Sequence, residues 1–234
     1  MSALFLLDKR LQIVQGDVVK ILPNGIAVIE GDTHISKWVE ESGRLDHDQY
    51  ALPIILEHIN EWDWVVDGGA FIGDHTRAYK DKVKAGMVLA FEPNAEAFEC
   101  LSHNCPDVTC IPFGLSDNSA PAWLDTRANA GASMVSDEVK GNWIQLIDLD
   151  SFNIVKLNFL KLDVEGCELK ALKGAEKAIK RSKPKMWIEV NEYALNQQDT
   201  TSEELIRFVE KLGYDITPYP EAGIPQYDIL CIPK

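Results

Sequence analysis

The sequence lacks the features that mark several classes of protein. None of its apolar runs approaches the roughly 18–20 residues that a membrane-spanning helix needs. The apolar run at residues 3–7 has no basic stretch before it and no clear cleavage site after it, so we expect no signal peptide. The five cysteines are odd in number and contain no Cys-x-x-Cys pair, which indicates reduced, mostly buried thiols in a cytoplasmic protein.

Basic residues are also scarce. The 234 residues include 23 Lys and Arg against 37 Asp and Glu, which gives a formal net charge of −14. Nucleic acids and anionic membrane surfaces attract proteins through Lys and Arg, so we expect neither as a partner. A hydrophobic fraction of 46% excludes disorder as the main state, and the length suggests one large domain or two small ones.

From residue 64 onwards, apolar strand-like runs alternate with helical patterns. We expect strands at residues 64–67, 87–91, 108–112, 159–163 and 186–190. We expect helices at residues 76–83, 95–104, 168–179 and 202–212, the last with Ser202 as N-cap and Gly213 as its stop. This alternation predicts a parallel sheet with helices on both faces. Two final strands, 214–218 and 227–232, have no helix between them and should pair antiparallel.

The remaining segments are less regular. Residues 1–60 read as an extension of the same domain, with strands at 12–14, 18–22 and 26–30 around a hairpin turn at Asn24-Gly25 and helices at 35–42 and 48–60. Residues 117–141 read as irregular except for a short strand at 122–125, and are followed by a short strand at 143–146 and a helical turn or two. The expected fold is therefore one α/β domain, residues 61–234, with residues 1–60 as its extension.

The first candidate site is the glycine-rich turn that follows the strand at residues 64–67. Its spacing, Asp-x-Gly-x-x-x-Gly from Asp67 to Gly73, differs from the Gly-x-Gly-x-x-Gly of dinucleotide enzymes. The acid can accept a hydrogen bond from an ammonium group, and the helix N-terminus beyond the turn offers N–H groups to a carboxylate. A ligand that carries both groups fits better than a pyrophosphate. The alternative is a tight turn that binds nothing.

Two further motifs end the next two strands. Glu92 stands 25 residues after Asp67, where an acid typically holds the two hydroxyls of a ribose, although it could also be a capping acid. Pro93 ends the strand and Asn94 can cap the next helix. Ser116-Asp117 follows the third strand and could hydrogen-bond an adenine edge, or form an ordinary turn.

The fourth motif, FLKLDVEG at residues 159–166, holds two carboxylates at a strand end. Asp163 and Glu165 could orient an acceptor hydroxyl, take its proton, bind a divalent cation, or serve only as acids at a helix N-terminus. His75, just past the glycine turn, is a third candidate base, or else an exposed polar residue of the first helical turn.

Four motifs follow one another in the sequence: DGGAFIG, FEPN, LSD and FLKLDVEGCELKALKGA. Together they resemble the FkbM-type family of S-adenosylmethionine (SAM)-dependent methyltransferases. The resemblance extends over about residues 25–233. Gly68 is a departure, because many members have a β-branched residue there. The resemblance implies a Rossmann-like class I methyltransferase sandwich with a mostly parallel seven-stranded sheet. An alcohol acceptor must lose its proton during transfer, and the candidate catalytic bases are Asp163, Glu165 and His75. The resemblance implies that Asp67, Gly69, Gly73, Glu92, Ser116, Asp117 and Asp163 lie around the cofactor. The full set of expected cofactor-binding residues adds Gly68, Ala70, Phe71, Thr76, Pro93 and Asn94.

The resemblance implies SAM as cofactor and O-methylation of a hydroxyl on a sugar or small molecule. An NAD-dependent oxidoreductase and a non-catalytic nucleotide-binding module are the alternatives. A Mg²⁺ route through Asp163, Glu189 and Asn191 is conceivable but is not favoured, so we expect no metal site. The small-residue stretch 128–136 and the segment around Trp38, His47 and Tyr50 could cover the site.

Overall fold

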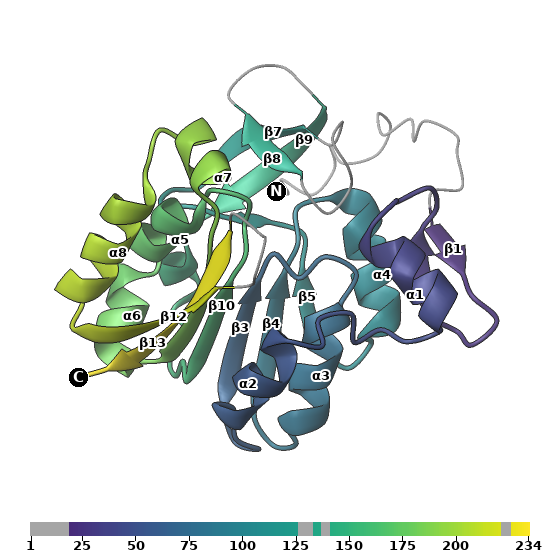
Figure 1. Cartoon of the computed structure of the whole chain (residues 1–234), viewed down its shortest axis with the longest axis horizontal. Helices are drawn as coiled ribbons and strands as arrows, with labels where there is room; N and C mark the ends of the chain where they lie inside the picture. Colours follow the sequence, from purple (N-terminus) through teal and green to yellow (C-terminus); the bar gives the residue numbers. More distant parts are fainter. Residues whose placement is uncertain (1–18, 126–132, 137–140, 221–225) are drawn as a thin grey trace, which may run out of the picture.

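The computed structural model describes residues 19–125, 133–136, 141–220 and 226–234 (Figure 1). Within these ranges a seven-stranded sheet forms the centre of the molecule. Its strands, in spatial order, are β12 (Tyr214–Pro220), β13 (Tyr227–Pro233), β11 (Lys185–Val190), β10 (Phe159–Leu162), β3 (Trp64–Gly68), β4 (Met87–Phe91) and β5 (Thr109–Ile111). The strands from β11 to β5 pair in parallel, whereas β13 runs antiparallel to both of its neighbours. The predicted parallel sheet and its C-terminal antiparallel pair are confirmed.

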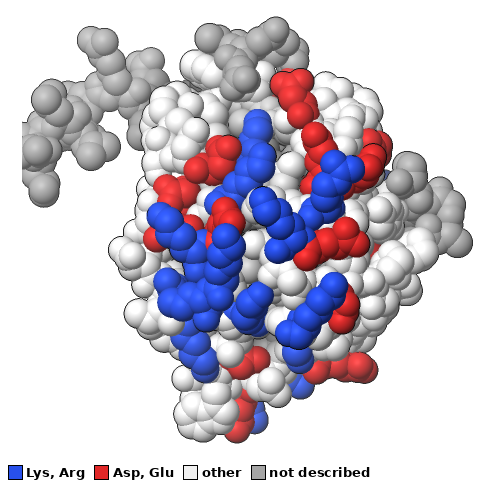
Figure 2. Space-filling model, turned by 90° about the vertical axis from the view of Figure 1, so that its left-hand side faces the viewer, with Lys and Arg blue, Asp and Glu red and all other residues white. Residues whose placement is uncertain are grey.

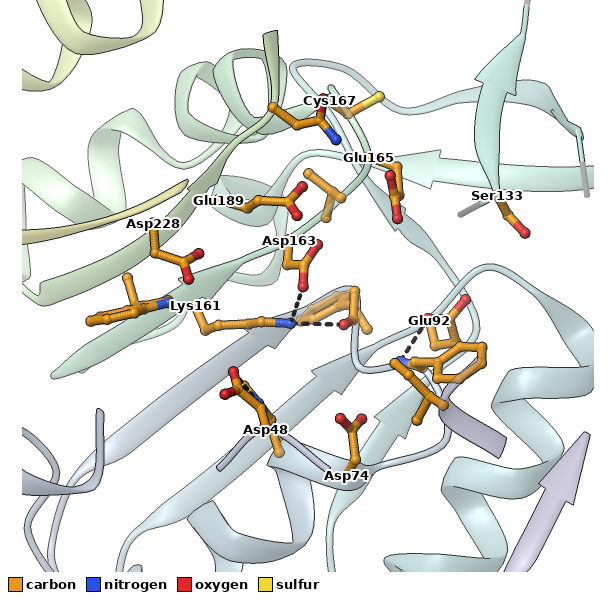
Figure 3. A pocket seen from close by; sticks show the side chains of 18 of the residues that line it. Asp48, Asp74, Glu92, Ser133, Lys161, Asp163, Glu165, Cys167, Glu189 and Asp228 are labelled. Atoms are coloured by element: carbon orange, nitrogen blue, oxygen red, sulfur yellow. Dashed lines mark hydrogen bonds and ion pairs between the residues drawn. The ribbon is translucent and has the colours of Figure 1, made fainter. Parts of the chain in front are cut away.

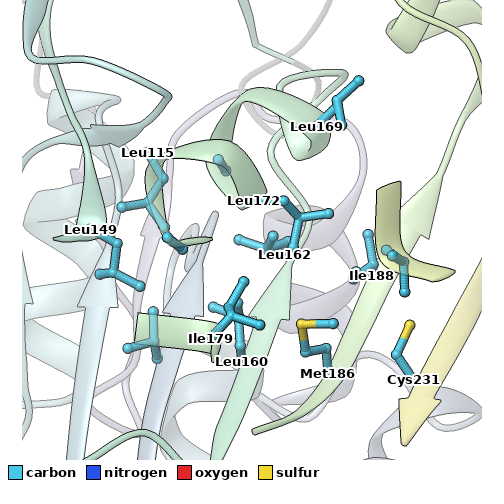
Figure 4. Packing of buried hydrophobic residues seen from close by; sticks show 14 of the residues in the cluster. Leu115, Leu149, Leu160, Leu162, Leu169, Leu172, Ile179, Met186, Ile188 and Cys231 are labelled. Atoms are coloured by element: carbon cyan, nitrogen blue, oxygen red, sulfur yellow. The ribbon is translucent and has the colours of Figure 1, made fainter. Parts of the chain in front are cut away.

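Both faces of this sheet are buried, which explains why its strands read as continuous apolar runs. Val65, Val88 and Phe159 pack under α2 (Ala51–Glu57) and α3 (Asp74–Lys82). The alternate side chains, such as Leu160 and Met186, pack under α5 (Glu168–Gly174), α6 (Glu176–Ser182) and α8 (Ser202–Lys211). Figure 4 shows the side chains of this cluster that come from the strands, α5 and α6. Helix α4 (Ala95–Asn104), which follows β4, has the bounds that the sequence predicts.

Two helix predictions need correction. The expected helix at 168–179 is interrupted at Ala175, because the Asp150 carboxylate accepts hydrogen bonds from the backbone N–H groups of Lys177 and Ala178 at 2.9 and 2.8 Å and starts a new helix there. The N-cap of α8 is Thr201 and not Ser202: the Thr201 hydroxyl accepts from Glu204 N–H, and the Glu204 carboxylate accepts from Thr201 N–H. The predicted stop, Gly213, is confirmed by its φ of +88°.

A second sheet lies above the carboxyl ends of the central strands (Figure 1). Its four described strands are β6 (Gly114–Leu115), β9 (Asn142–Ile147), β7 (Ala120–Asp125) and β8 (Met134–Ser136). The prediction that residues 117–141 are irregular is therefore wrong at β8. The strand predicted at 122–125 corresponds to β7 but is too short by two residues. Alternate residues, among them Leu124 and Ile144, form a small apolar cluster that explains the pairing. The predicted helical turn after β9 is a 3₁₀ helix at Leu149–Phe152.

The N-terminal region packs against α4. Strands β1 (Val19–Ile21) and β2 (Ala27–Ile29) form the predicted hairpin, and α1 (Ile35–Ser42) follows with the predicted bounds. The Asn104 side chain of α4 bonds both the N–H and the C=O of Ala27, at 2.8 and 2.9 Å. The expected strand at 12–14 and part of the stretch 128–136 lie outside the described residues. A further helix, α7 (Glu192–Gln197), was not predicted.

Charge is unevenly distributed over the molecule. Lys and Arg gather on the outer face of α5, α6 and α8 (Figure 2), and the exposed ones there are Lys173, Lys177, Lys180, Arg181, Arg207 and Lys211. No described helix is long and apolar enough to cross a membrane. The five cysteines all fall in the described ranges, where four are buried, Cys110 is half-buried and no two form a disulfide.

Candidate active site

A cavity of about 770 Å³ opens at the carboxyl ends of β3, β4, β10 and β11 (Figure 3). Ligands of open α/β sheets bind at this edge, because the strand ends and the loops after them form a crevice there. The cavity lies between these strand ends and residues from the 34–51 segment. Seven of the sequence-predicted site residues line it, namely Gly69, Phe71, His75, Glu92, Pro93, Asp163 and Glu165.

The glycine turn brings β3, β4 and β10 together. Asp67 is fully buried beneath the cavity, and its Oδ2 accepts a 2.6 Å hydrogen bond from the Thr76 hydroxyl of α3. Gly69 has a φ of +77°, and a Cβ at this position would lie 1.7 Å from the carbonyl oxygen of Asp163. Gly69 is therefore required for the turn to pack against the end of β10. Asp67 and Thr76 support the turn from below instead of lining the cavity.

Glu92 faces the cavity from the end of β4 with only 6% of its surface exposed. One carboxylate oxygen accepts from Phe71 N–H and the other from Asn94 N–H, each at 2.8 Å. Burial raises the pKa of Glu92 to about 7, although these N–H groups act in the opposite direction. Each oxygen keeps a second lone pair, so the side chain can accept a further pair of hydroxyl donors. Asn94 caps α4 as predicted.

Lys161 is a residue of the site that the sequence analysis did not single out. Its Nζ lies 3.2 Å from Asp163 Oδ2 and 3.7 Å from Asp67 Oδ1, and donates to the Gly69 carbonyl at 3.0 Å. Burial lowers the pKa of Lys161, but the charges of Asp163 and Asp67 outweigh it, so the pKa is raised. The sequence pattern could have indicated this role, because Lys161 precedes Asp163 by two positions and alternate residues of a strand share one face.

Glu165 lies on a turn with an unusual backbone conformation. Its φ is +52°, in the left-handed region that non-glycine residues rarely adopt, and Gly166 follows with a φ of +97°. The Glu168 carboxylate holds this turn, because it accepts from Val164 N–H at 2.9 Å and from Gly166 N–H at 3.2 Å. Burial, together with the charge of Asp163, raises the pKa of Glu165 to about 8. A strained acid that titrates near neutrality is typical of a functional residue.

His75 is buried, so the interpretation of this residue as an exposed polar side chain is wrong. Its Nδ1 lies 3.1 Å from the Tyr79 hydroxyl and its Nε2 lies 3.3 Å from Asp48 Oδ2. Burial lowers the pKa of His75, but the Asp48 hydrogen bond and the charge of Asp74 outweigh it and the pKa is raised. Burial by itself would raise the pKa of Asp48, but the His75 contact brings it down to about 2.

The segment that carries Asp48 forms one wall of the cavity. His47 and Tyr50 line the cavity, in keeping with the expectation that this segment covers the site. Trp38 does not line it, and instead packs edge-on against His47 with ring centroids 5.3 Å apart. From the 128–136 stretch, Ser133 and Val135 reach the cavity.

Other predicted residues do not line this cavity. Ser116 is buried, and its N–H donates to the Ile147 carbonyl at 2.9 Å, while Asp117 borders a second hollow between α5 and α8. The cavity wall near them consists instead of Gly114 and Leu115. The remaining predicted residues that do not line the cavity are Gly68, Ala70, Gly73 and Asn94.

Two of the three residues of the Mg²⁺ route, Asp163 and Asn191, have other contacts. Asp163 is paired with Lys161, and the Asn191 side chain accepts from Ala194 N–H as the N-cap of α7. The described residues contain no group of three or more His, Cys, Asp or Glu placed to hold a metal ion.

Comparisons with known proteins agree with this geometry. The model of the methyltransferase FkbM domain matches residues 67–216, which begin at Asp67 and contain the four motifs. Hexuronic acid methyltransferase AglP of Haloferax volcanii is 31% identical over 157 residues, which cover 60% of this chain and 63% of the relative. The chain thus spans less than two thirds of the length of that relative.

Solved structures share the fold. The crystal structure of methyltransferase FkbM from Methylobacillus flagellatus KT has a TM-score of 0.56 at 21% identity, over 74% of this chain and 44% of that one. An rRNA methylase from Streptococcus thermophilus has a TM-score of 0.52 at 15% identity, over 78% of this chain and 93% of that one. The α/β sandwich is therefore the class I methyltransferase fold.

Proposed function

The chain belongs to the FkbM methyltransferase family, and from this premise we propose that it transfers a methyl group from SAM to a hydroxyl oxygen of a sugar. The observation that carries the proposal is the cavity at the carboxyl ends of β3, β4 and β10, where Glu92 and Asp163 meet the glycine turn. The hexuronic acid methyltransferase among the relatives supports a sugar as the acceptor.

The residues of the cavity fit SAM as the methyl donor. Glu92 has free lone pairs for the two ribose hydroxyls, and the turn at Gly69 and Phe71 would receive the methionine part. Pro93 and Leu115 offer an apolar edge for the adenine, in place of the polar contacts expected from Ser116 and Asp117. SAM carries a sulfonium cation, so a cavity with several carboxylates complements its charge. An oxidoreductase is disfavoured because the turn lacks the dinucleotide spacing.

When bound, SAM supplies an electrophilic methyl group, and the chain has to position the acceptor oxygen and remove its proton. Glu165 is our candidate for the base, because it lines the cavity and its pKa of about 8 allows proton uptake near neutral pH. Asp163 is held by Lys161 and is better suited to orienting the hydroxyl. His75 has both ring nitrogens engaged by Asp48 and Tyr79, which leaves it in a supporting role.

A methyl-transfer assay tests this proposal. The protein is incubated with SAM and a panel of neutral, amino and acidic oligosaccharides, and S-adenosylhomocysteine release is measured with and without each sugar. We expect sugar-dependent release that is lost in Glu165→Gln and kept in Glu210→Gln, an exposed acid of α8. If no sugar increases the release of S-adenosylhomocysteine, sugar methylation is contradicted. If Glu165→Gln keeps full activity, the assignment of Glu165 as the base is contradicted.

A further inference from the structure

Two carboxylates face each other across the antiparallel strands β11 and β13. In the register of these strands Glu189 lies directly opposite Asp228. Directly opposed residues project from the same face, with Cβ atoms roughly 4.5–5.5 Å apart, and like charges in such a pair are destabilising. Both side chains line the cavity (Figure 3). The fold thus keeps an unfavourable charge pair at the edge of the site.

No group in the described part of the chain compensates this pair. Neither carboxylate has a hydrogen bond or an ion pair with another residue in the described part of the chain. Oε2 of Glu189 is shielded from solvent and has no hydrogen-bond partner among the residues that the structure describes. Lys161 is the only Lys or Arg among the described residues that line the cavity, and Asp163 and Asp67 already engage it. A buried acid without a donor is costly unless a ligand supplies one.

The surroundings of the pair are acidic as well. Burial, followed by the charge of Asp163, raises the pKa of Glu189 and also that of Asp228, the latter to about 7. Asp48 and Glu165 line the same cavity. The pair lies on β11 and β13, away from the turn after β3 and from Glu92 at the end of β4, where the cofactor would bind. It therefore belongs to the half of the cavity that is left for the acceptor.

We propose that Glu189 and Asp228 bind a protonated amino group of the methyl acceptor, which makes an amino sugar the preferred substrate over a uronic acid. This inference rests on the proposed function, since it assigns the acceptor half of the same cavity. An ammonium group has three N–H donors and satisfies both carboxylates at once. A uronate carboxylate would instead add one more negative charge to a wall whose only described Lys or Arg, Lys161, is already engaged by Asp163 and Asp67.

Calorimetry on the protein saturated with S-adenosylhomocysteine tests this assignment. The probes are three oligosaccharides of equal length: a glucosamine oligomer, its N-acetylated counterpart and a galacturonate oligomer. We expect the glucosamine oligomer to bind at least about tenfold more tightly than the acetylated one, as charge-assisted hydrogen bonds would give. The galacturonate oligomer should bind most weakly. The preference for the amine should disappear in Glu189→Gln and in Asp228→Asn, and persist in Glu210→Gln.

The outcomes separate this inference from the proposed function. If S-adenosylhomocysteine binds but the acetylated or the galacturonate oligomer binds as tightly as the amine, the acceptor assignment is wrong and the methyltransferase assignment stands. Persistence of the amine preference in both variants, or no binding of the glucosamine oligomer, also overturns the assignment. A wild type that fails to bind S-adenosylhomocysteine overturns both proposals. Unchanged S-adenosylhomocysteine affinity in the two variants shows that they are folded.

Discussion

Nζ of Lys161 lies 3.7 Å from Oδ1 of Asp67; both side chains are buried, Lys161 in the wall of the cavity and Asp67 beneath it. The two residues are direct neighbours in the register of β10 and β3. Lys161 also contacts Asp163 and the Gly69 carbonyl, so one ammonium group joins the strand before the glycine turn to the end of the strand that carries Asp163. The shape of the floor of the site depends on this single cation.

Removal of this cation should destabilise the protein strongly. Lys161→Met leaves Asp67 as an unpaired buried charge, for which we expect a loss of about 3–5 kcal/mol in the free energy of unfolding, measured in urea. The double variant Lys161→Met/Asp67→Asn should recover part of the loss. Lys177→Met, on the exposed face of α6, is the matched control and should stay within about 0.5 kcal/mol of wild type. Equal stability of Lys161→Met and Lys177→Met would contradict this account.

The stability of the ligand-free protein should fall as the pH rises from about 5 to 8. Burial raises the pKa of Glu92 and Asp228 to about 7 and that of Glu165 to about 8, so in this window the folded chain holds more protons than the unfolded chain. The raised pKa of His75 acts in the same direction. Thermal unfolding at a series of pH values measures the slope, and Asp228→Asn should flatten it. Stability that rises across this window would contradict the burial of ionisable carboxyl groups.

The pH dependence of methyl transfer should identify the base. If Glu165 takes the proton, the rate rises with pH, with a midpoint at or below about 8, because bound SAM adds a positive charge that lowers the pKa of the acid. Glu165→Gln should lower kcat by about 10²–10⁴ and abolish this rise. His75→Gln should lower the rate less and keep the rise. If the rise survives in Glu165→Gln and is lost in His75→Gln, the base is His75.

The capping box of α8 can be tested with two adjacent residues. Thr201→Ala should cost about 1 kcal/mol of stability, since it leaves the Glu204 N–H without its acceptor. Ser202→Ala should cost less, because the hydroxyl of Ser202 is not the cap. Urea unfolding of the two variants decides between them, and a larger loss in Ser202→Ala would contradict the cap.

The sequence predicted most of the central sheet because its strands are buried on both faces and read as apolar runs. It missed β8 and part of β7, where alternation is short and interrupted by polar residues and Pro121. It joined α5 and α6 because the cap that separates them, Asp150, lies 27 residues away from Lys177 in the chain.

The motifs identified Glu92, Asp163 and Glu165, since each follows a strand that ends at the cavity. They could not reveal that Asp48 contacts His75, or that Glu189 opposes Asp228, because those contacts depend on how separate segments pack. Asp117 followed the expected strand but borders a different hollow.

The central claim is that the cavity binds SAM through Glu92 and the glycine turn. Calorimetric titration of the protein with SAM, alongside NAD, tests it most directly, with Glu92→Ala as the site variant and Glu99→Ala, an exposed acid of α4, as the control. We predict saturable SAM binding in wild type and Glu99→Ala, at least about tenfold weaker binding in Glu92→Ala, and no binding of NAD. Binding of NAD in place of SAM, or SAM affinity that does not change in Glu92→Ala, would contradict the account.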